Sequence, residues 1–147
     1  MAVSYTEDMG IEFVEASPQR AEGVMEIAPR FHQPYGFVHG GVTLTLLESV
    51  ASKGAEVHAD LSRERPFGIS IDVRHRKAAR EGQLRGVAEL DHVEGNKQFW
   101  NIAAYDDAGD VVSSGTFVSK VVSLERLREK GMEVPPMEGE REGEQLR

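Results

Sequence analysis

Residues 36–52 read GFVHGGVTLTLLESVAS and decide how this chain folds. The segment predicts a helix over about residues 42–57, and its leucine and valine side chains would cover nearly the whole circumference. A helix that is apolar all round is a buried one. Glu48 carries the only formal charge of the segment, so we expect a desolvated carboxylate, which proteins keep mainly where it has partners or chemistry to do.

Small residues stand where this helix should begin. Val38-His39-Gly40-Gly41 would leave backbone N–H groups free to face a ligand oxygen, because the two glycines carry no side chain. An acid and an oxyanion site within one short segment indicate an enzyme.

The rest of the chain alternates between strand patterns and turn signals. Strands are expected at residues 11–15 and 23–27 before the helix, and at 67–74, 83–92, 97–105 and 111–122 after it. Four successive strands without helices between them predict an α+β fold, a largely antiparallel curved sheet wrapped around one long buried helix. We expect a single domain over residues 1–122, followed over 123–147 by a short helical segment and a disordered tail.

Composition narrows the classes of function. The chain has 147 residues, no cysteine and a formal net charge of −8. It therefore lacks thiolate nucleophiles and cysteine-based zinc sites, and its acidity argues against nucleic acid as a partner. Because neither a secretion signal nor a stretch long enough to span a membrane is apparent, we expect a soluble cytoplasmic protein without a membrane partner.

A local basic cluster stands out in this acidic chain. Arg74, His75, Lys77 and Arg80 fall within seven residues, and phosphates on a small ligand would suit such a cluster. The alternative is a solvated strand end whose charges keep the edge soluble. The histidines show no spacing typical of metal ligands, so no metal site is expected.

Two motifs resemble a known family. QPYGFVHGG over residues 33–41, followed by LES over 47–49 with the acid nine positions after His39, resembles the hotdog-fold acyl-CoA thioesterases. The branch most similar contains the Glu-dependent 4-hydroxybenzoyl-CoA and 1,4-dihydroxy-2-naphthoyl-CoA thioesterases. The resemblance covers roughly residues 10–122. The similar phenylacetate-pathway thioesterases have Asp where this chain has Glu48, which favours the aryl-CoA branch over the phenylacetyl one.

The resemblance implies a role for each candidate residue. Glu48 would be the nucleophile or general base, and Gly40 would donate its backbone N–H to the oxyanion. Gln33 would give a second hydrogen bond to the thioester carbonyl, His39 would orient the loop, and Ser52 would hold the carboxylate or a water. The substrate would be held by Ser49, Phe67, Arg74, His75, Lys77 and Arg80. No cofactor is implied, since coenzyme A is part of the substrate.

Helix geometry adds a constraint on assembly. Gly40 and Glu48 lie eight residues apart on one helix, which places them about 12 Å apart along its axis. One thioester carbonyl cannot touch both groups of the same chain. If both serve one reaction, they come from different subunits, so we expect a homodimer or a dimer of dimers.

Two other functions are compatible with this fold. An enoyl-CoA hydratase would need a paired Asp and His acting on the acyl chain, and that pairing is not found. A non-catalytic acyl-CoA-binding or regulatory hotdog protein would use Glu48 merely to fix the dimer.

Overall fold

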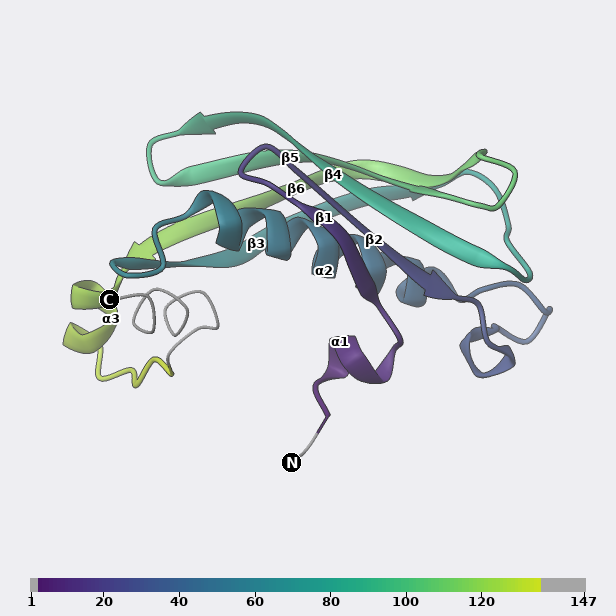
Figure 1. Cartoon of the computed structure of the whole chain (residues 1–147), viewed down its shortest axis with the longest axis horizontal. Helices are drawn as coiled ribbons and strands as arrows, with labels where there is room; N and C mark the ends of the chain where they lie inside the picture. Colours follow the sequence, from purple (N-terminus) through teal and green to yellow (C-terminus); the bar gives the residue numbers. More distant parts are fainter. Residues whose placement is uncertain (1–2, 136–147) are drawn as a thin grey trace.

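The computed structural model describes residues 3–135, which form one curved sheet around a central helix (Figure 1). The elements in chain order are α1 (Tyr5–Asp8), β1 (Glu12–Ala16), β2 (Arg20–Glu26), the 3-10 helix η1 (Pro29–Phe31), α2 (Gly40–His58), β3 (Glu64–His75), β4 (Gln83–Glu94), β5 (Lys97–Tyr105), β6 (Val111–Ser123) and α3 (Leu124–Glu129).

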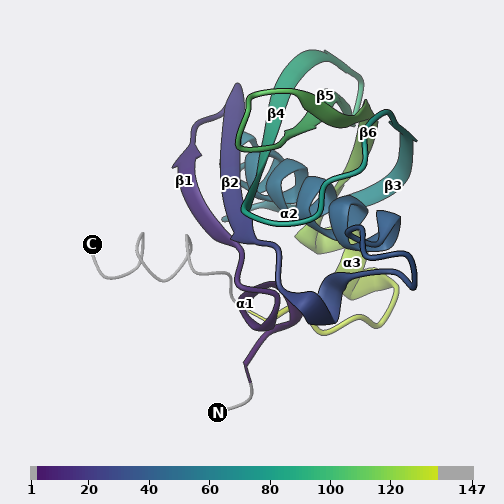
Figure 2. The same ribbon diagram turned by 90° about the vertical axis from the view of Figure 1, so that its right-hand side faces the viewer.

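All six strands belong to one antiparallel sheet with the order β1-β2-β4-β5-β6-β3. The β4–β5 and β5–β6 connections are hairpins that turn at Gly95 and Gly109, where φ is +60° and +83°. Glycine adopts such values at no steric cost. Seen from the end, the sheet curls around α2 (Figure 2), which confirms the predicted α+β class. Strands β1 and β3 are its two edges.

Helix α2 is buried on one side only, which corrects the expectation of a helix buried all round. The side facing the sheet consists of Thr43, Leu46, Leu47, Val50, Ala51, Gly54 and Ala55. These positions recur every three or four residues and therefore lie on one face of a helix. On the other side, Leu44 is only half-buried and Val57 is exposed. The sheet curls around α2 without enclosing it.

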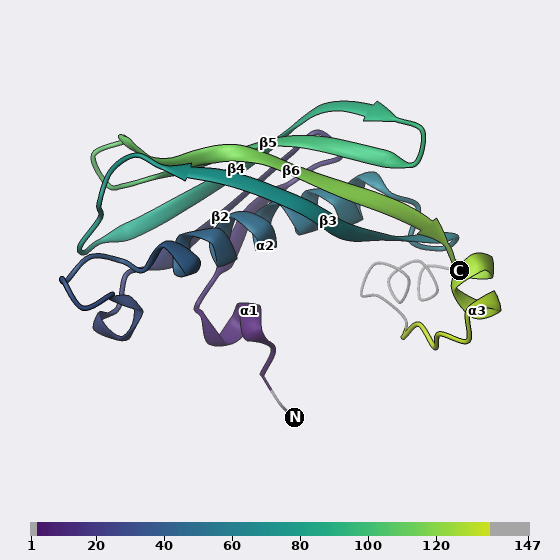
Figure 3. The ribbon, with the colours of Figure 1, turned by 180° about the vertical axis from the view of Figure 1, so that it is seen from behind.

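The N-terminal helix was not predicted from the sequence. It lies on the side of α2 that faces away from the sheet (Figures 1 and 3). Met9 and Ile11, which follow it, are buried in the core, and Arg30 donates a 3.0 Å hydrogen bond to the Asp8 carbonyl. Helix α1 is thus fixed to the domain and partly covers α2.

At the C-terminal end, β6 runs one residue beyond the predicted strand and α3 supplies the expected short helix. Most of the segment predicted to be disordered, residues 136–147, lies outside the described residues. Within residues 3–135, no helix is long and apolar enough to cross a membrane.

Candidate active site

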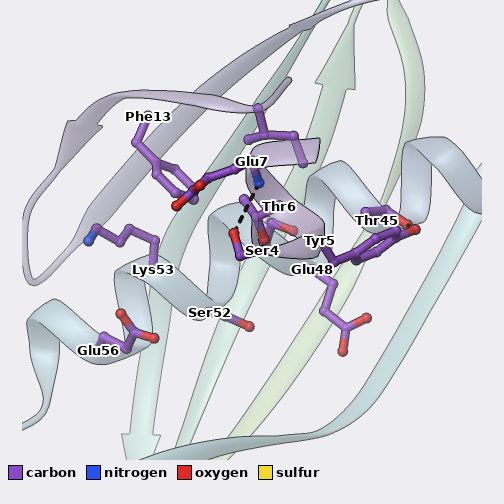
Figure 4. Close-up of a pocket in the computed structure, with 12 residues that line it drawn as sticks. Ser4, Tyr5, Thr6, Glu7, Phe13, Thr45, Glu48, Ser52, Lys53 and Glu56 are labelled. Atoms are coloured by element: carbon purple, nitrogen blue, oxygen red, sulfur yellow. Dashed lines mark hydrogen bonds between the residues drawn. The ribbon is translucent and has the colours of Figure 1, made fainter. Parts of the chain in front are cut away.

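A pocket of about 550 Å³ lies between α1, β1 and the open face of α2 (Figure 4). Helix α2 contributes one row of side chains to it, at positions three and four residues apart. The remaining side chains come from the N-terminal segment and β1. The residues that line the pocket are Ser4, Tyr5, Thr6, Glu7, Ile11, Phe13, Thr45, Glu48, Ser49, Ser52, Lys53 and Glu56.

Glu48 lies on this open face, and its side chain is exposed in the single chain. The expectation of a desolvated carboxylate is therefore wrong for the isolated chain, because the core-facing positions of α2 are taken by its apolar residues. The carboxylate points away from α1 (Figure 4) and approaches the edge strand, since a Cβ atom at Gly68 would lie 3.7 Å from Glu48 Oε1. The pairing of β3 with β6 shifts register between Gly68 and Ser70. An extra residue of this kind bends a strand locally.

The start of α2 leaves one backbone donor available. His39 is the N-cap, and its Nδ1 accepts a 2.9 Å hydrogen bond from the Gly41 N–H. That His39 orients the loop stays a prediction, with which this contact is compatible. The N–H of Gly40, the first residue of α2, has no acceptor inside the helix. It lies at the positive end of the helix dipole, where a negatively charged oxygen is favoured.

His75 lies directly against this helix start. A Cβ atom at Gly40 would be only 2.8 Å from His75 Nε2, so only glycine fits beside the unmoved ring. The ring is held from the other side, where its Nδ1 lies 2.7 Å from the hydroxyl of the fully buried Ser113. The structure thus places His75 at the candidate oxyanion donor.

Gln33 lies in the loop before α2 with its amide oxygen already used. Its side-chain Oε1 accepts a hydrogen bond from the Tyr35 backbone N–H, and its own N–H donates to the Phe37 carbonyl. The side-chain NH₂ group is left as the part of Gln33 that can donate to a substrate carbonyl.

The basic cluster is only partly available to a ligand. Lys77 Nζ lies 2.6 Å from Asp106 and 2.7 Å from Asp110. The hydrogen bond to Asp106 is the main cause that raises the pKa of Lys77 above its usual value, and it lowers the pKa of the Asp106 carboxyl. Lys77 is therefore charged, but two carboxylates already neutralise it. The Arg80 guanidinium lies 4.4 Å from the centre of the Phe37 ring, and Arg74 is exposed.

The structure groups the candidates into two places. Ser49 and Ser52 line the pocket together with Glu48, and no hydrogen bond of the described residues joins either serine to that carboxylate. Gln33, His39, Gly40 and His75 gather at the N-terminal end of α2. Phe67 lies on β3, is 40% exposed and does not line the pocket.

Sequence reasoning missed nine of the twelve pocket residues, among them Tyr5, Thr45 and Lys53. Two signals could have found these three. The first is the capping-box spacing of Ser4 and Glu7, which marks the start of a helix and so of α1. Ser4 Oγ indeed accepts a hydrogen bond from the Glu7 N–H. Thr45 lies three residues before Glu48 and Lys53 four residues after Ser49, so helical periodicity places each beside a predicted site residue. Among residues 3–135, no cluster of three or more His, Cys, Asp and Glu side chains could hold a metal ion.

Comparisons with known proteins agree on one family. The family model described as "Thioesterase superfamily" matches residues 35–113. A 1,4-dihydroxy-2-naphthoyl-CoA hydrolase from Listeria monocytogenes is 34% identical over 69% of this chain and 81% of that protein. The proofreading thioesterase EntH from Cronobacter turicensis is 32% identical over 70% of this chain and 74% of its own length. A mutant thioesterase from Pseudomonas aeruginosa superposes with a TM-score of 0.78 and 26% identity, covering 82% and 87% of the two chains.

Proposed function

We propose an aromatic acyl-CoA as the substrate of this chain, which belongs to the thioesterase superfamily and is a thioester hydrolase. Its fold is the hotdog fold, as the sequence motifs implied. The products would be a free acid and coenzyme A. The single observation that carries this proposal is the position of Glu48, an exposed carboxylate on the open face of α2 that lines the pocket and has no ion-pair partner within residues 3–135.

Glu48 would supply the reactive group. A thioester is cleaved either by direct attack of a carboxylate or by a water from which a base removes a proton. The exposed position of Glu48 supports both routes, because neither substrate nor water has to enter the core to reach it. Ser52, one helical turn further on the same face, would hold the carboxylate or the water.

Gly40 and Gln33 would stabilise the developing negative charge on the thioester oxygen. The Gly40 N–H lacks an intrahelical acceptor, and the Gln33 amide has its NH₂ group left to donate. Preorganised donors of this kind stabilise a transition state by about 3 kcal/mol each. His75, in contact with Gly40, would hold the substrate or the helix start in place.

A second copy of the chain would complete each site. Glu48 and Gly40 are about 12 Å apart along α2, too far to act on one carbonyl within one chain. Edge strand β3 also has unpaired backbone groups along one side and exposes Ile69, so pairing with a partner's β3 would cover it. A two-fold dimer would contain two equivalent sites, and two dimers could associate further.

The coenzyme A portion of the substrate would be held by the basic residues near the end of β3. Arg74 and Arg80 are the members that carboxylates do not already neutralise among the described ion pairs, so they are the better candidates for phosphate binding. Lys77 would serve mainly to fix the loop. The acyl group would lie in the pocket, in contact with Ser49, and Phe67 would flank it from β3.

A substrate panel tests the proposed chemistry. We expect thiol release from benzoyl-CoA and 2-naphthoyl-CoA, with a kcat/KM that exceeds the value for palmitoyl-CoA by about tenfold or more, the effect expected for a pocket of limited size. The measurement is the release of free thiol by the purified protein, with protein-free reactions as the control. Failure to hydrolyse either aromatic ester, or a kcat/KM for palmitoyl-CoA at or above theirs, would refute the proposed substrate class.

A further inference from the structure

Helix α1 forms one wall of the pocket that contains Glu48. Tyr5 and Thr6 of this helix and Phe13 of β1 face the side chains of α2 across the pocket (Figure 4). The buried residues Met9 and Ile11 anchor the segment that follows α1. The wall is therefore a fixed part of the domain. It lies outside residues 35–113, the part of the chain that the family model matches.

A directed hydrogen bond holds Tyr5 in place. Thr45 Oγ1 donates its hydrogen to the Gly41 carbonyl at 2.9 Å, and the same oxygen lies 2.9 Å from the Tyr5 hydroxyl. Since the threonine hydroxyl has only one hydrogen, the Tyr5 O–H must be the donor of the second bond. Tyr5 is thus tied to α2 three residues before Glu48, on the side of the pocket towards Gly40.

The opposite end of the pocket is closed by another aromatic side chain. Phe13 lies beside Lys53, whose Nζ is 5.6 Å from the centre of the Phe13 ring. Thr45 and Lys53 are eight residues apart on α2, so the two ends lie about 12 Å apart along the axis. Between them, the floor carries Glu48, Ser49 and Ser52. This span matches an acyl group of one or two rings and is shorter than an extended palmitoyl chain.

We propose that Tyr5 is a specificity-determining residue, whose ring limits the size of the acyl group that lies beside Glu48. This inference rests on the proposed function, because it assumes that the acyl group of the substrate occupies the pocket. Aromatic rings at both ends would pack against a flat acyl group, while the serine hydroxyls of α2 would contact polar substituents.

Size selection by Tyr5 can be tested with benzoyl-CoA and decanoyl-CoA. Tyr5→Ala should raise the ratio of kcat/KM for decanoyl-CoA over benzoyl-CoA by about tenfold or more, because the pocket gains room for several methylenes. Tyr5→Trp should lower the same ratio, and Tyr5→Phe, which keeps the ring, should stay closer to the wild type than Tyr5→Ala. Val3→Ala, an exposed residue of the same segment that does not line the pocket, should leave the ratio unchanged.

Each result decides between this inference and an alternative. An unchanged ratio in folded, active Tyr5→Ala would overturn it, as would an equal loss with both esters, which a purely structural role of Tyr5 predicts. If the wild-type protein hydrolyses neither ester, the proposed function fails. Calorimetry of the binding of the same two thioesters then tests the inference separately. An unchanged ratio of the affinities for decanoyl-CoA and benzoyl-CoA in Tyr5→Ala would overturn it.

Discussion

Glu48→Ala should lower kcat by about 10²–10⁴-fold, the contribution expected of a positioned general base, and by more if the carboxylate attacks directly. The fold should be unaffected, because Glu48 is exposed on the open face of α2 and fills no part of the core. Substitutions at such positions usually change the free energy of unfolding by about 0.5 kcal/mol or less. Single-turnover kinetics measures the loss of activity, and thermal unfolding measures the stability of the variant.

Two further variants complete this experiment. Glu48→Gln keeps the shape of the side chain, so it should bind substrate nearly as the wild type does while losing turnover. Glu89→Ala removes another exposed acid, on β4 and away from the pocket, and should leave kcat unchanged. If Glu48→Ala lost activity together with its oligomeric state in size-exclusion chromatography, a structural role for the acid would be indicated.

Gly40→Ala should reduce kcat by about 10²-fold, the cost that small misplacements of reacting groups can reach. The added methyl group would be 2.8 Å from His75 Nε2, so either the ring or the start of α2 must move. The ring cannot easily yield, because Ser113 holds it through Nδ1. The variant keeps the backbone N–H of residue 40. A loss of activity would therefore come from a change in the position or the surroundings of this N–H. Steady-state kinetics of the variant measures this effect.

A double variant separates steric displacement from other effects at Gly40. His75→Ala removes the ring that the new methyl group would strike. Gly40→Ala combined with His75→Ala should therefore lose little more activity than His75→Ala alone, which is the non-additivity expected of residues in contact. Fully additive losses would show that Gly40→Ala acts through something other than the contact with His75.

The fold could be predicted from sequence because its signals are local. Residues 67–74 of strand β3 alternate between apolar and polar or small residues with a period of two, and the hairpins are marked by glycines with positive φ. Helix α2 was found from its long apolar run. Its exposed face was missed, because hydrophobicity alone does not tell which side of a helix a curved sheet will cover. Glu48 was expected to be buried for the same reason.

The site was predictable only in part, since its residues meet through tertiary structure. The motif over residues 33–41 led to the donors at the start of α2. His75 was assigned to phosphate binding with its charged neighbours, but it packs on Gly40, 35 positions earlier in the chain, because β3 returns alongside α2. The contact between Tyr5 and Thr45 spans forty positions and has no local signal in the sequence.

Mixing two inactive variants tests most directly the central claim that one chain's Glu48 works with the donors of another chain. Chains with Glu48→Ala and chains with Gln33→Ala would be combined, and tagged heterodimers verified after exchange. A shared site predicts recovery of about a quarter of the wild-type activity in a fully exchanged equal mixture, because half of the dimers are mixed and each contains one intact site of two. No recovery in verified heterodimers would contradict the account, since each site would then lie within a single chain.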